Sequence, residues 1–149
     1  DRMGLDGQSF RMLKFRTMAV DAEAASGPVW AHEGDARRTP IGPFLRRFSL
    51  DELPQFVNVL RGEMSVVGPR PERPVFVERF RQTVPGYMLR HKVRSGLTGW
   101  AQIHGLRGNT SLEKRIQFDI EYIERWSFWL DLKIIALTVV WVLSDRNAY

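Results

Sequence analysis

The N-terminal residues have the pattern of a β-hairpin. Apolar residues in Met3–Leu5 and in Ser9–Met18 flank the dipeptide Asp6-Gly7. An Asp-Gly pair between two apolar runs is typical of a tight hairpin turn, since both residues tolerate positive φ. We therefore expect a small β-hairpin at the start of the chain.

A helical period begins in the middle of the chain and indicates a helix over Phe44–Arg61. The apolar positions of one face are Leu53, Phe56, Val57 and Leu60. Ser49 and Glu52 form an S-x-x-E capping box, which predicts that a helix begins at this point. Arg61-Gly62 supplies a basic last turn and a glycine stop.

The other segments alternate short regular elements with loops. Ala19–Ala25 is expected to form a short helix, and Ser26–Pro43 a polar loop rich in glycine and proline. Ser65–Val67 has the composition of a strand, and Glu72–Val84 that of a helix. Pro85–Gly108 contains five glycines and is expected to be a loop.

The C-terminal third is predicted to be helical. Thr110 and Glu113 form a second capping box, followed by an apolar stripe made of Leu112, Ile116, Ile120 and Ile123. The predicted fold is α+β and mostly helical, with a small N-terminal hairpin packed on helices, long loops and an aromatic-rich C-terminal helix.

Trp126–Leu143 is the most apolar stretch of the chain. Asp131 and Lys133 interrupt it, and the apolar run that remains is well short of the roughly 20 residues needed to span a bilayer. Its tryptophans suit a membrane interface, where an indole buries its ring and keeps its N–H in water. The sequence leaves two alternatives open: an interfacial helix, or a buried core helix with aromatic anchors.

The composition suggests that the chain binds an anionic partner. The 149 residues fit one domain, and the formal net charge is +5. From Arg61 to Arg107 nine basic residues stand against three acidic ones, so the positive charge is concentrated in the middle third. The alternative is a solvated basic face without a ligand. The absence of cysteine excludes disulfides, thiolate metal sites and thiol nucleophiles.

The adjacent carboxylates of Asp51 and Glu52 are the first candidates for chemistry. Acidic residues are common in a first helical turn, where the helix dipole stabilises them, so a purely structural role is the simpler alternative. However, Arg46 and Arg47 directly precede the pair and place positive charge at the same helix start. Two carboxylates without a cysteine or histidine cluster favour a hard cation such as Mg²⁺ over zinc.

Arg70 is the most rigidly placed basic residue in the sequence. Pro69 and Pro71 restrict the backbone on both sides of it. A rigid guanidinium loses little freedom when it binds a phosphoryl group, so Arg70 and the carboxylates together suggest phosphoryl transfer.

For Asp119 and the histidines the sequence does not point to a functional role. Arg115 precedes Asp119 by one turn, and an i,i+4 ion pair explains this acid adequately. His32, His91 and His104 lie far apart without metal-ligand spacing, and no role is assigned to them.

An ordered series of motifs carries a family resemblance. It runs through KFRTM at 14–18, FLRR at 44–47, SLDELPQ at 49–55, NVLRGEMS at 58–65, VGPRPE at 67–72, GLTGWAQ at 96–102 and WSFWLDLK at 126–133. In these segments the chain resembles the bacterial sugar transferases, the monotopic polyprenyl-phosphate phosphoglycosyl transferases. The resemblance covers essentially the whole chain.

The resemblance implies a reaction and its site. A sugar 1-phosphate would pass from a UDP-sugar to undecaprenyl phosphate with release of UMP, initiating exopolysaccharide or capsule repeat-unit synthesis with the help of Mg²⁺. Asp51 would attack the sugar-bearing phosphorus and carry a covalent phosphosugar. Glu52 would hold Mg²⁺, together with Asp51, or assist proton movement. Arg46, Arg70 and Lys14 would bind phosphate.

The resemblance also bears on two further residues and on location. Asp119 matches a downstream acidic position of the family, and Arg47 adjoins a phosphate-binding position. Family members carry a re-entrant membrane helix just before the hairpin, and residues 1–149 are expected to be a single catalytic domain that lacks this helix. The expected location is the cytoplasmic face of the bacterial inner membrane, with the membrane surface as a partner. A homo-oligomer is also compatible with the sequence.

Two other classes of function remain as alternatives. The first is a non-catalytic, arginine-rich module that binds an anionic surface. Nucleic acid is not expected as its partner, because aromatic residues do not interleave with the basic run as stacking requires. The second is a fragment that serves only as an assembly partner.

Overall fold

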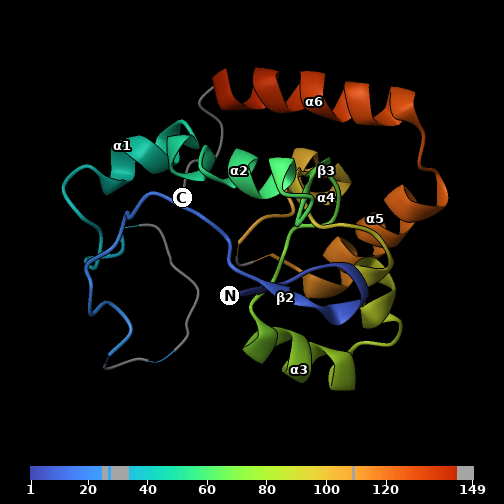
Figure 1. The fold of residues 1–149 in the computed structure, drawn as a ribbon, viewed down its shortest axis with the longest axis horizontal. Coiled ribbons are helices and arrows are strands. Elements are labelled where there is room, and N and C mark those ends of the chain that lie inside the picture. The colour runs from blue at the N-terminus through green and yellow to red at the C-terminus, as the bar shows by residue number, and fades with distance from the viewer. Residues whose placement is uncertain (25–26, 28–33, 109, 144–149) are drawn as a thin grey trace.

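The computed structural model describes residues 1–24, 27, 34–108 and 110–143. The elements are β1 (Arg2–Met3), η1 (Leu5–Gly7), β2 (Ser9–Phe10), α1 (Gly42–Arg47), η2 (Leu50–Glu52), α2 (Gln55–Leu60), β3 (Ser65–Val67), α3 (Pro74–Thr83), η3 (Tyr87–Lys92), β4 (Gly96–Thr98), α4 (Trp100–Ile103), α5 (Leu112–Glu124) and α6 (Phe128–Leu143). The fold is α+β and mostly helical, as predicted. Figure 1 shows α6 along one side, α1 and α2 beside it, and α3 on the opposite side.

The N-terminal hairpin is confirmed, although its second arm is shorter than expected. β1 and β2 pair antiparallel, and the turn between them has Asp6 at φ 50° and Gly7 at φ 77°. Beyond Phe10 the chain is held by a side chain instead of a strand. Asn58 donates to the Arg11 carbonyl at 2.8 Å and accepts from the Leu13 amide at 3.0 Å.

The second sheet pairs β3 with β4 in parallel, with Ser65 opposite Gly96 and Val67 opposite Thr98. The backbones cross closely just after β3, since a Cβ on Gly96 would overlap the Gly68 amide nitrogen. The Gly96 amide donates to the Pro69 carbonyl at 2.9 Å. This contact fixes the backbone immediately before Arg70.

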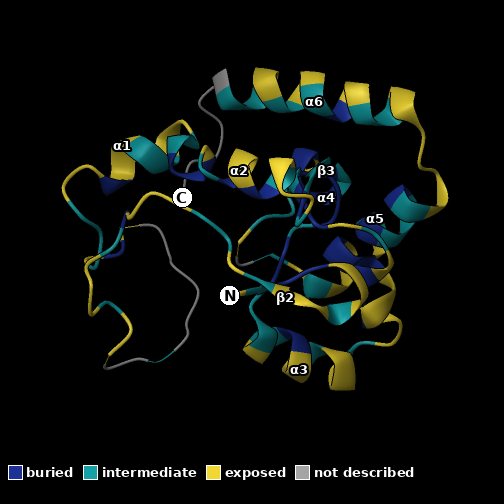
Figure 2. Cartoon of the chain, viewed as in Figure 1, coloured by how far each residue is buried: buried dark blue, intermediate teal, exposed yellow. Residues whose placement is uncertain are grey.

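Two apolar clusters form the core. Met3, Val77, Tyr87 and Ile116 join the hairpin, α3, η3 and α5. Val67, Ile103, Tyr122 and Ile134 join β3, α4, α5 and α6. Figure 2 shows buried positions gathered around β3, α4 and α5, whereas α1, α2 and α6 carry many exposed ones. Both clusters meet on α5, which therefore links the hairpin side of the molecule to α6.

The helix predicted over Phe44–Arg61 is broken into α1, the 3-10 turn η2 and α2. Ser49 is not a helix cap, because its backbone is left-handed at φ 52° and its side chain makes no capping hydrogen bond. Glu52 cannot close the predicted capping box, since its carboxylate binds Arg70 and Lys14 instead. The end of the helix at Leu60 and the turn at Gly62 agree with the prediction.

Three other boundaries differ from expectation. The described part of Ala19–Ala25 forms turns and not a helix, and Ala25 itself lies outside the described residues. Pro85–Gly108 contains η3, β4 and α4, because its glycines separate short elements instead of forming one loop. The cap of α5 is Ser111, whose hydroxyl accepts from the Lys114 amide at 3.3 Å, and not Thr110.

The helix α6 is partly buried and partly open. Ile134 is fully buried, whereas Trp129 is 76% exposed. Neither alternative from the sequence describes it completely, because one side packs on the core and the other carries aromatic and aliphatic side chains into solvent. Among the described residues, no helix is both long and apolar enough to cross a bilayer.

His91 is expected to make folding stability depend on pH. The ring is 4% exposed, and burial together with the charge of Arg90 lowers its pKa from about 6.5 to about 4. The unfolded chain therefore binds a proton that the folded chain excludes between these values, so stability falls as pH falls. We expect a loss of about 2 kcal/mol from this group between pH 7.5 and 5.

Urea unfolding at pH 7.5 and pH 5 measures this effect, because both values lie above the ordinary range of the carboxylates. The variant His91→Gln should show a much smaller difference between the two pH values. An equal difference in the variant and in the unaltered chain would refute the assignment to His91.

Candidate active site

Asp51 and Glu52 lie in the short turn η2, between α1 and α2. Both are largely buried, at 5% and 8% exposure. The Asp51 carbonyl accepts a hydrogen bond from the Phe15 amide at 3.0 Å, which ties the turn to the segment that follows β2. The two acids are thus held in a tight turn that long-range contacts stabilise.

Two cations from distant parts of the sequence converge on these acids. Lys14 Nζ lies 3.3 Å from Asp51 Oδ2 and 3.0 Å from Glu52 Oε1. Arg70 Nη2 lies 2.6 Å from Glu52 Oε1. Four of the residues singled out in the sequence therefore come together in one site.

The two carboxylates have different surroundings. Burial opposes the charge of Glu52, but Arg70 and Lys14 outweigh it and hold the pKa of Glu52 far below its usual range. In turn, the charge of Glu52 raises the pKa of Arg70. Asp51 has a single ion pair, to Lys14 through Oδ2, and its Oδ1 accepts no hydrogen bond from the residues that the structure describes. Glu52 is therefore engaged, while one oxygen of Asp51 remains available.

Arg46 and Arg47 occupy the last turn of α1. Arg46 Nε donates to Thr17 Oγ1 at 3.0 Å. Burial lowers the pKa of Arg46, and the charge of Asp51 partly offsets this effect. The Arg46 guanidinium therefore acts at longer range on Asp51 and Glu52, which we call the dyad. Arg47 is exposed, and its guanidinium lies 5.5 Å from the centre of the Phe48 ring.

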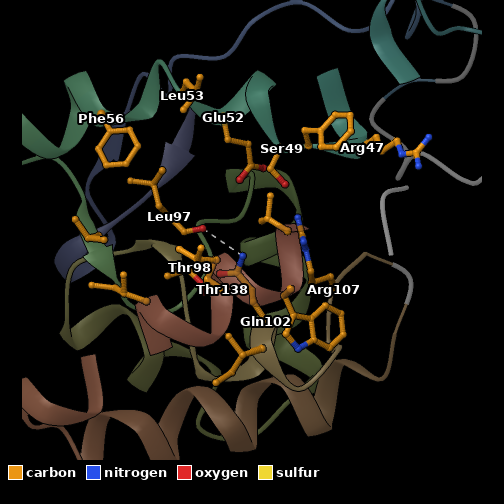
Figure 3. A pocket seen from close by; sticks show the side chains of 17 residues that line it. Arg47, Ser49, Glu52, Leu53, Phe56, Leu97, Thr98, Gln102, Arg107 and Thr138 are labelled. Carbon is orange, nitrogen blue, oxygen red and sulfur yellow. Dashed lines mark hydrogen bonds between the residues drawn. The ribbon is translucent and has the colours of Figure 1, made fainter. Parts of the chain in front are cut away.

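Arg107 belongs to the site although no motif pointed to it. Burial and the charge of Arg70 lower its pKa, while Glu52 and Asp51 act in the opposite direction. Its side chain makes no hydrogen bond or ion pair with the described residues. In Figure 3, Arg107 and Glu52 point toward one another from opposite sides of a pocket. The only sequence signal for Arg107 was its place in the basic middle third.

The pocket beside the dyad has a volume of about 370 Å³. Its polar end contains Glu52, Ser49 and Arg107. Thr98 and Thr138 also line the pocket, and their hydroxyls are hydrogen-bonded at 2.6 Å. The rest of the lining is mostly apolar and comes from α2, β3, β4, α4 and above all α6, for example Phe56, Leu97 and Val139. The pocket therefore suits a ligand with an anionic group and an apolar body.

Asp119 lies outside the immediate site. It is buried on α5 and pairs with Arg90 at 2.8 Å, not with Arg115 as the i,i+4 spacing predicted. Arg115 pairs instead with Glu72 at 3.0 Å. Burial favours these longer-range pairs because each buried charge needs a partner from whichever element packs against it.

The charge of the site favours a polyanionic ligand. Lys14, Arg46, Arg70 and Arg107 surround two carboxylates, so positive charge is in excess. The described residues contain no cluster of three or more acidic or histidine side chains that could bind a metal. A metal at this place would rely on the dyad and on ligand oxygens, which is a donor set that Mg²⁺ accepts.

The chain is similar to a family of known proteins. The family model described as "Bacterial sugar transferase" matches residues 1–145. The chain is 52% identical to the UDP-glucose:undecaprenyl-phosphate glucose-1-phosphate transferase of Escherichia coli, with 99% of this chain and 32% of the relative covered. The protein of that name from Xanthomonas campestris is 49% identical, with 99% and 31% covered.

A relative with a different sugar in its name also matches. The UDP-N-acetylgalactosamine-undecaprenyl-phosphate N-acetylgalactosaminephosphotransferase of Aeromonas hydrophila is 42% identical, with 99% of this chain and 35% of the relative covered. The chain thus spans about a third of the length of these relatives. Because the family model matches residues 1–145, the chain belongs to the bacterial sugar transferase family.

Proposed function

We propose that this chain catalyses transfer of a sugar 1-phosphate from a UDP-sugar to undecaprenyl phosphate, with release of UMP. The observation that carries the proposal is the buried Asp51, which keeps one carboxylate oxygen unengaged among several cations. The names of the relatives, which specify undecaprenyl phosphate and a sugar phosphate, support the same reaction.

In the first step, the Asp51 carboxylate attacks the sugar-bearing phosphorus of the UDP-sugar. A bond forms between the carboxylate oxygen and phosphorus, and the bond from that phosphorus to the bridging oxygen breaks. UMP leaves with the bonding electron pair, and an aspartyl phosphosugar remains. Lys14, Arg46 and Arg70 stabilise the negative charge on the phosphates during this step.

In the second step, a phosphate oxygen of undecaprenyl phosphate attacks the same phosphorus. The bond to Asp51 breaks, the carboxylate is regenerated, and the lipid carries the sugar as a diphosphate. The pocket supports this step, since its apolar walls begin at the dyad and offer a surface to the isoprenoid chain.

Glu52 holds positively charged side chains in place beside Asp51. Its pKa is held so far below neutral that it is a weak proton acceptor at physiological pH, which argues against proton movement as its main task. Its carboxylate keeps Arg70 and Lys14 in place beside Asp51. With Asp51 it would also hold Mg²⁺, which when bound neutralises charge on the diphosphate.

The exposed apolar side chains of α1, α2 and α6 suit a membrane surface. They include Phe44, Phe48, Phe56, Leu60, Phe128, Trp129, Val139 and Val140. These helices lie along one side of the molecule, next to the pocket. We propose that this side rests on the cytoplasmic face of the bacterial inner membrane, where the lipid acceptor is present.

Substitution on α6 is expected to weaken membrane binding. Trp129→Ser combined with Val140→Ser removes exposed apolar area from the proposed contact, so partition to anionic vesicles should fall about tenfold or more. Val75→Ser is the control, because Val75 is 49% exposed on α3, on the opposite side of the molecule. Equal partition of both variants in vesicle sedimentation would exclude α6 from the contact.

Transfer of label tests the reaction itself. The chain is incubated with Mg²⁺, undecaprenyl phosphate and a UDP-sugar labelled in the sugar, with UDP-glucose and UDP-N-acetylgalactosamine as the first pair. We expect label in the organic phase together with free UMP. Vesicle binding with neither product would instead support the non-catalytic anion-binding module.

A further inference from the structure

Four buried charges form a compact cluster behind the active site. Arg90 and Asp119 are both 2% exposed and pair at 2.8 Å. Arg115 and Glu72 are similarly buried and pair at 3.0 Å. We call Arg90, Asp119, Arg115 and Glu72 the charge quartet. It contains two positive and two negative side chains, so its formal charge is zero.

The first pair of the quartet binds the backbone of Arg70. Arg90 Nη2 donates to the Arg70 carbonyl at 2.8 Å, while Arg90 Nη1 donates to the Tyr87 hydroxyl at 3.2 Å. One guanidinium therefore joins Asp119, on α5, to the backbone of the residue that holds Glu52. The Pro69 carbonyl, just before this residue, accepts from the Gly96 amide at the β3–β4 crossing.

The second pair binds the turn that follows Arg107. Arg115 Nη2 donates to the Gly108 carbonyl at 2.5 Å, and Arg115 Nη1 contacts Glu72. Glu72 is two residues after Arg70, and Gly108 is next to Arg107. Each arginine of the quartet thus anchors the main chain beside one arginine of the site.

The two acids of the quartet offset the cost of burying Arg90 and Arg115. A buried guanidinium without an anion carries a large desolvation cost, so Arg90 would rearrange toward water if Asp119 lost its charge. The Arg70 carbonyl would then lose its donor. A displacement of about 1 Å in a group that binds the reacting phosphate is enough to slow a reaction substantially.

We propose that the charge quartet is a positioning device for the two guanidiniums of the site. Asp119 acts through Arg90 on Arg70, and Glu72 acts through Arg115 on the turn that carries Arg107. Neither acid touches the ligand; both set where the phosphate-binding arginines lie. This inference rests on the proposed function, in which Arg70 binds the phosphates of the UDP-sugar.

A double-mutant cycle tests the link between Asp119 and Arg70. Asp119→Asn should lower kcat/KM for UMP release from the UDP-sugar by about tenfold, mainly through KM. In the Arg70→Ala background the same substitution should change kcat/KM by less than about twofold, because the residue it positions is gone. Arg125→Gln, which removes the exposed ion pair with Glu121, is the control and should leave kcat/KM unchanged.

Hydrogen exchange supplies a second readout that does not depend on turnover. In Asp119→Asn the amides that hold the segment around Arg70, those of Gly96 on the Pro69 carbonyl and of Met3 on the Glu72 carbonyl, should exchange faster, while those of α6 keep their rates. Faster exchange throughout the molecule would mean a general loss of stability and would overturn the positioning role.

The two proposals fail in different ways. Equal fold-losses from Asp119→Asn in the two backgrounds would refute positioning while leaving the reaction intact. Full turnover in Arg70→Ala would refute the use of Arg70 in the reaction. If Asp119→Asn does not fold, Arg90→Lys replaces it in the same cycle, because a single ammonium cannot reproduce the forked contacts of Arg90.

Discussion

Replacing Asp51 with asparagine should abolish the release of UMP from a UDP-sugar. The amide has nearly the size of the carboxylate but cannot form the bond to phosphorus, so the first step loses its nucleophile. We expect turnover to fall by about four orders of magnitude or more, as for loss of a nucleophile elsewhere. Quantification of UMP, with Mg²⁺ and undecaprenyl phosphate present, measures the loss.

Asp6→Asn is the matched control for this variant. Asp6 also pairs with a lysine, Lys92, at 3.2 Å, but both side chains are exposed and lie in the hairpin turn and η3. Asp6→Asn should therefore keep normal turnover. Undiminished UMP release by Asp51→Asn would rule out the covalent mechanism proposed here.

Replacing Arg70 with alanine should impair both turnover and stability. The variant loses a guanidinium aimed at the phosphates, which is expected to lower kcat/KM about 10²- to 10³-fold. It also leaves the buried Glu52 carboxylate with Lys14 as its remaining ion-pair partner. Because an incompletely paired buried charge is costly, we expect the free energy of unfolding at pH 7 to fall by about 2 kcal/mol.

The stability loss in Arg70→Ala should depend on pH in a defined direction. Arg70 lowers the pKa of Glu52, so the ion pair stabilises the fold fully above the ordinary pKa of about 4.5 and loses this effect progressively as pH falls from there toward the much lower pKa of the folded state. The difference between the variant and the unaltered chain in urea unfolding should therefore shrink from pH 7 to pH 3.5.

Arg73→Ala provides the control for this comparison. Arg73 makes the same type of pair with Glu23, at 2.6 Å, but both side chains are considerably exposed. Its loss should cost well under about 1 kcal/mol and leave turnover unchanged. An equal cost for both variants would show that the Arg70–Glu52 pair gains nothing from its burial.

Local patterns predicted the parts of the fold that depend on neighbours in sequence. The Asp6-Gly7 pair predicted the hairpin turn, and apolar residues at helical spacing predicted α3, α5 and α6. The break at Ser49 could not be predicted in this way. Glu52 fits a capping box by spacing, but Lys14 and Arg70, which are 38 and 18 residues away, bind its carboxylate more strongly than the free helix amides can.

The same reasoning explains what was found and missed in the site. The family motifs contain Lys14, Asp51, Glu52 and Arg70, and the structure brings these residues together. Arg107 was missed because its position depends on how the turn after α4 folds back over the dyad. The i,i+4 spacing assigned Arg115 to Asp119, whereas packing of η3 on α5 places Arg90 there.

The most direct test of the account is the intact mass of the chain after mixing with a UDP-sugar and Mg²⁺ in the absence of undecaprenyl phosphate. The covalent mechanism predicts a mass increase of one sugar phosphate, located on the peptide that carries Asp51, absent from Asp51→Asn, and lost when undecaprenyl phosphate is added. Release of UMP without this adduct, or an adduct on any other residue, would contradict the account.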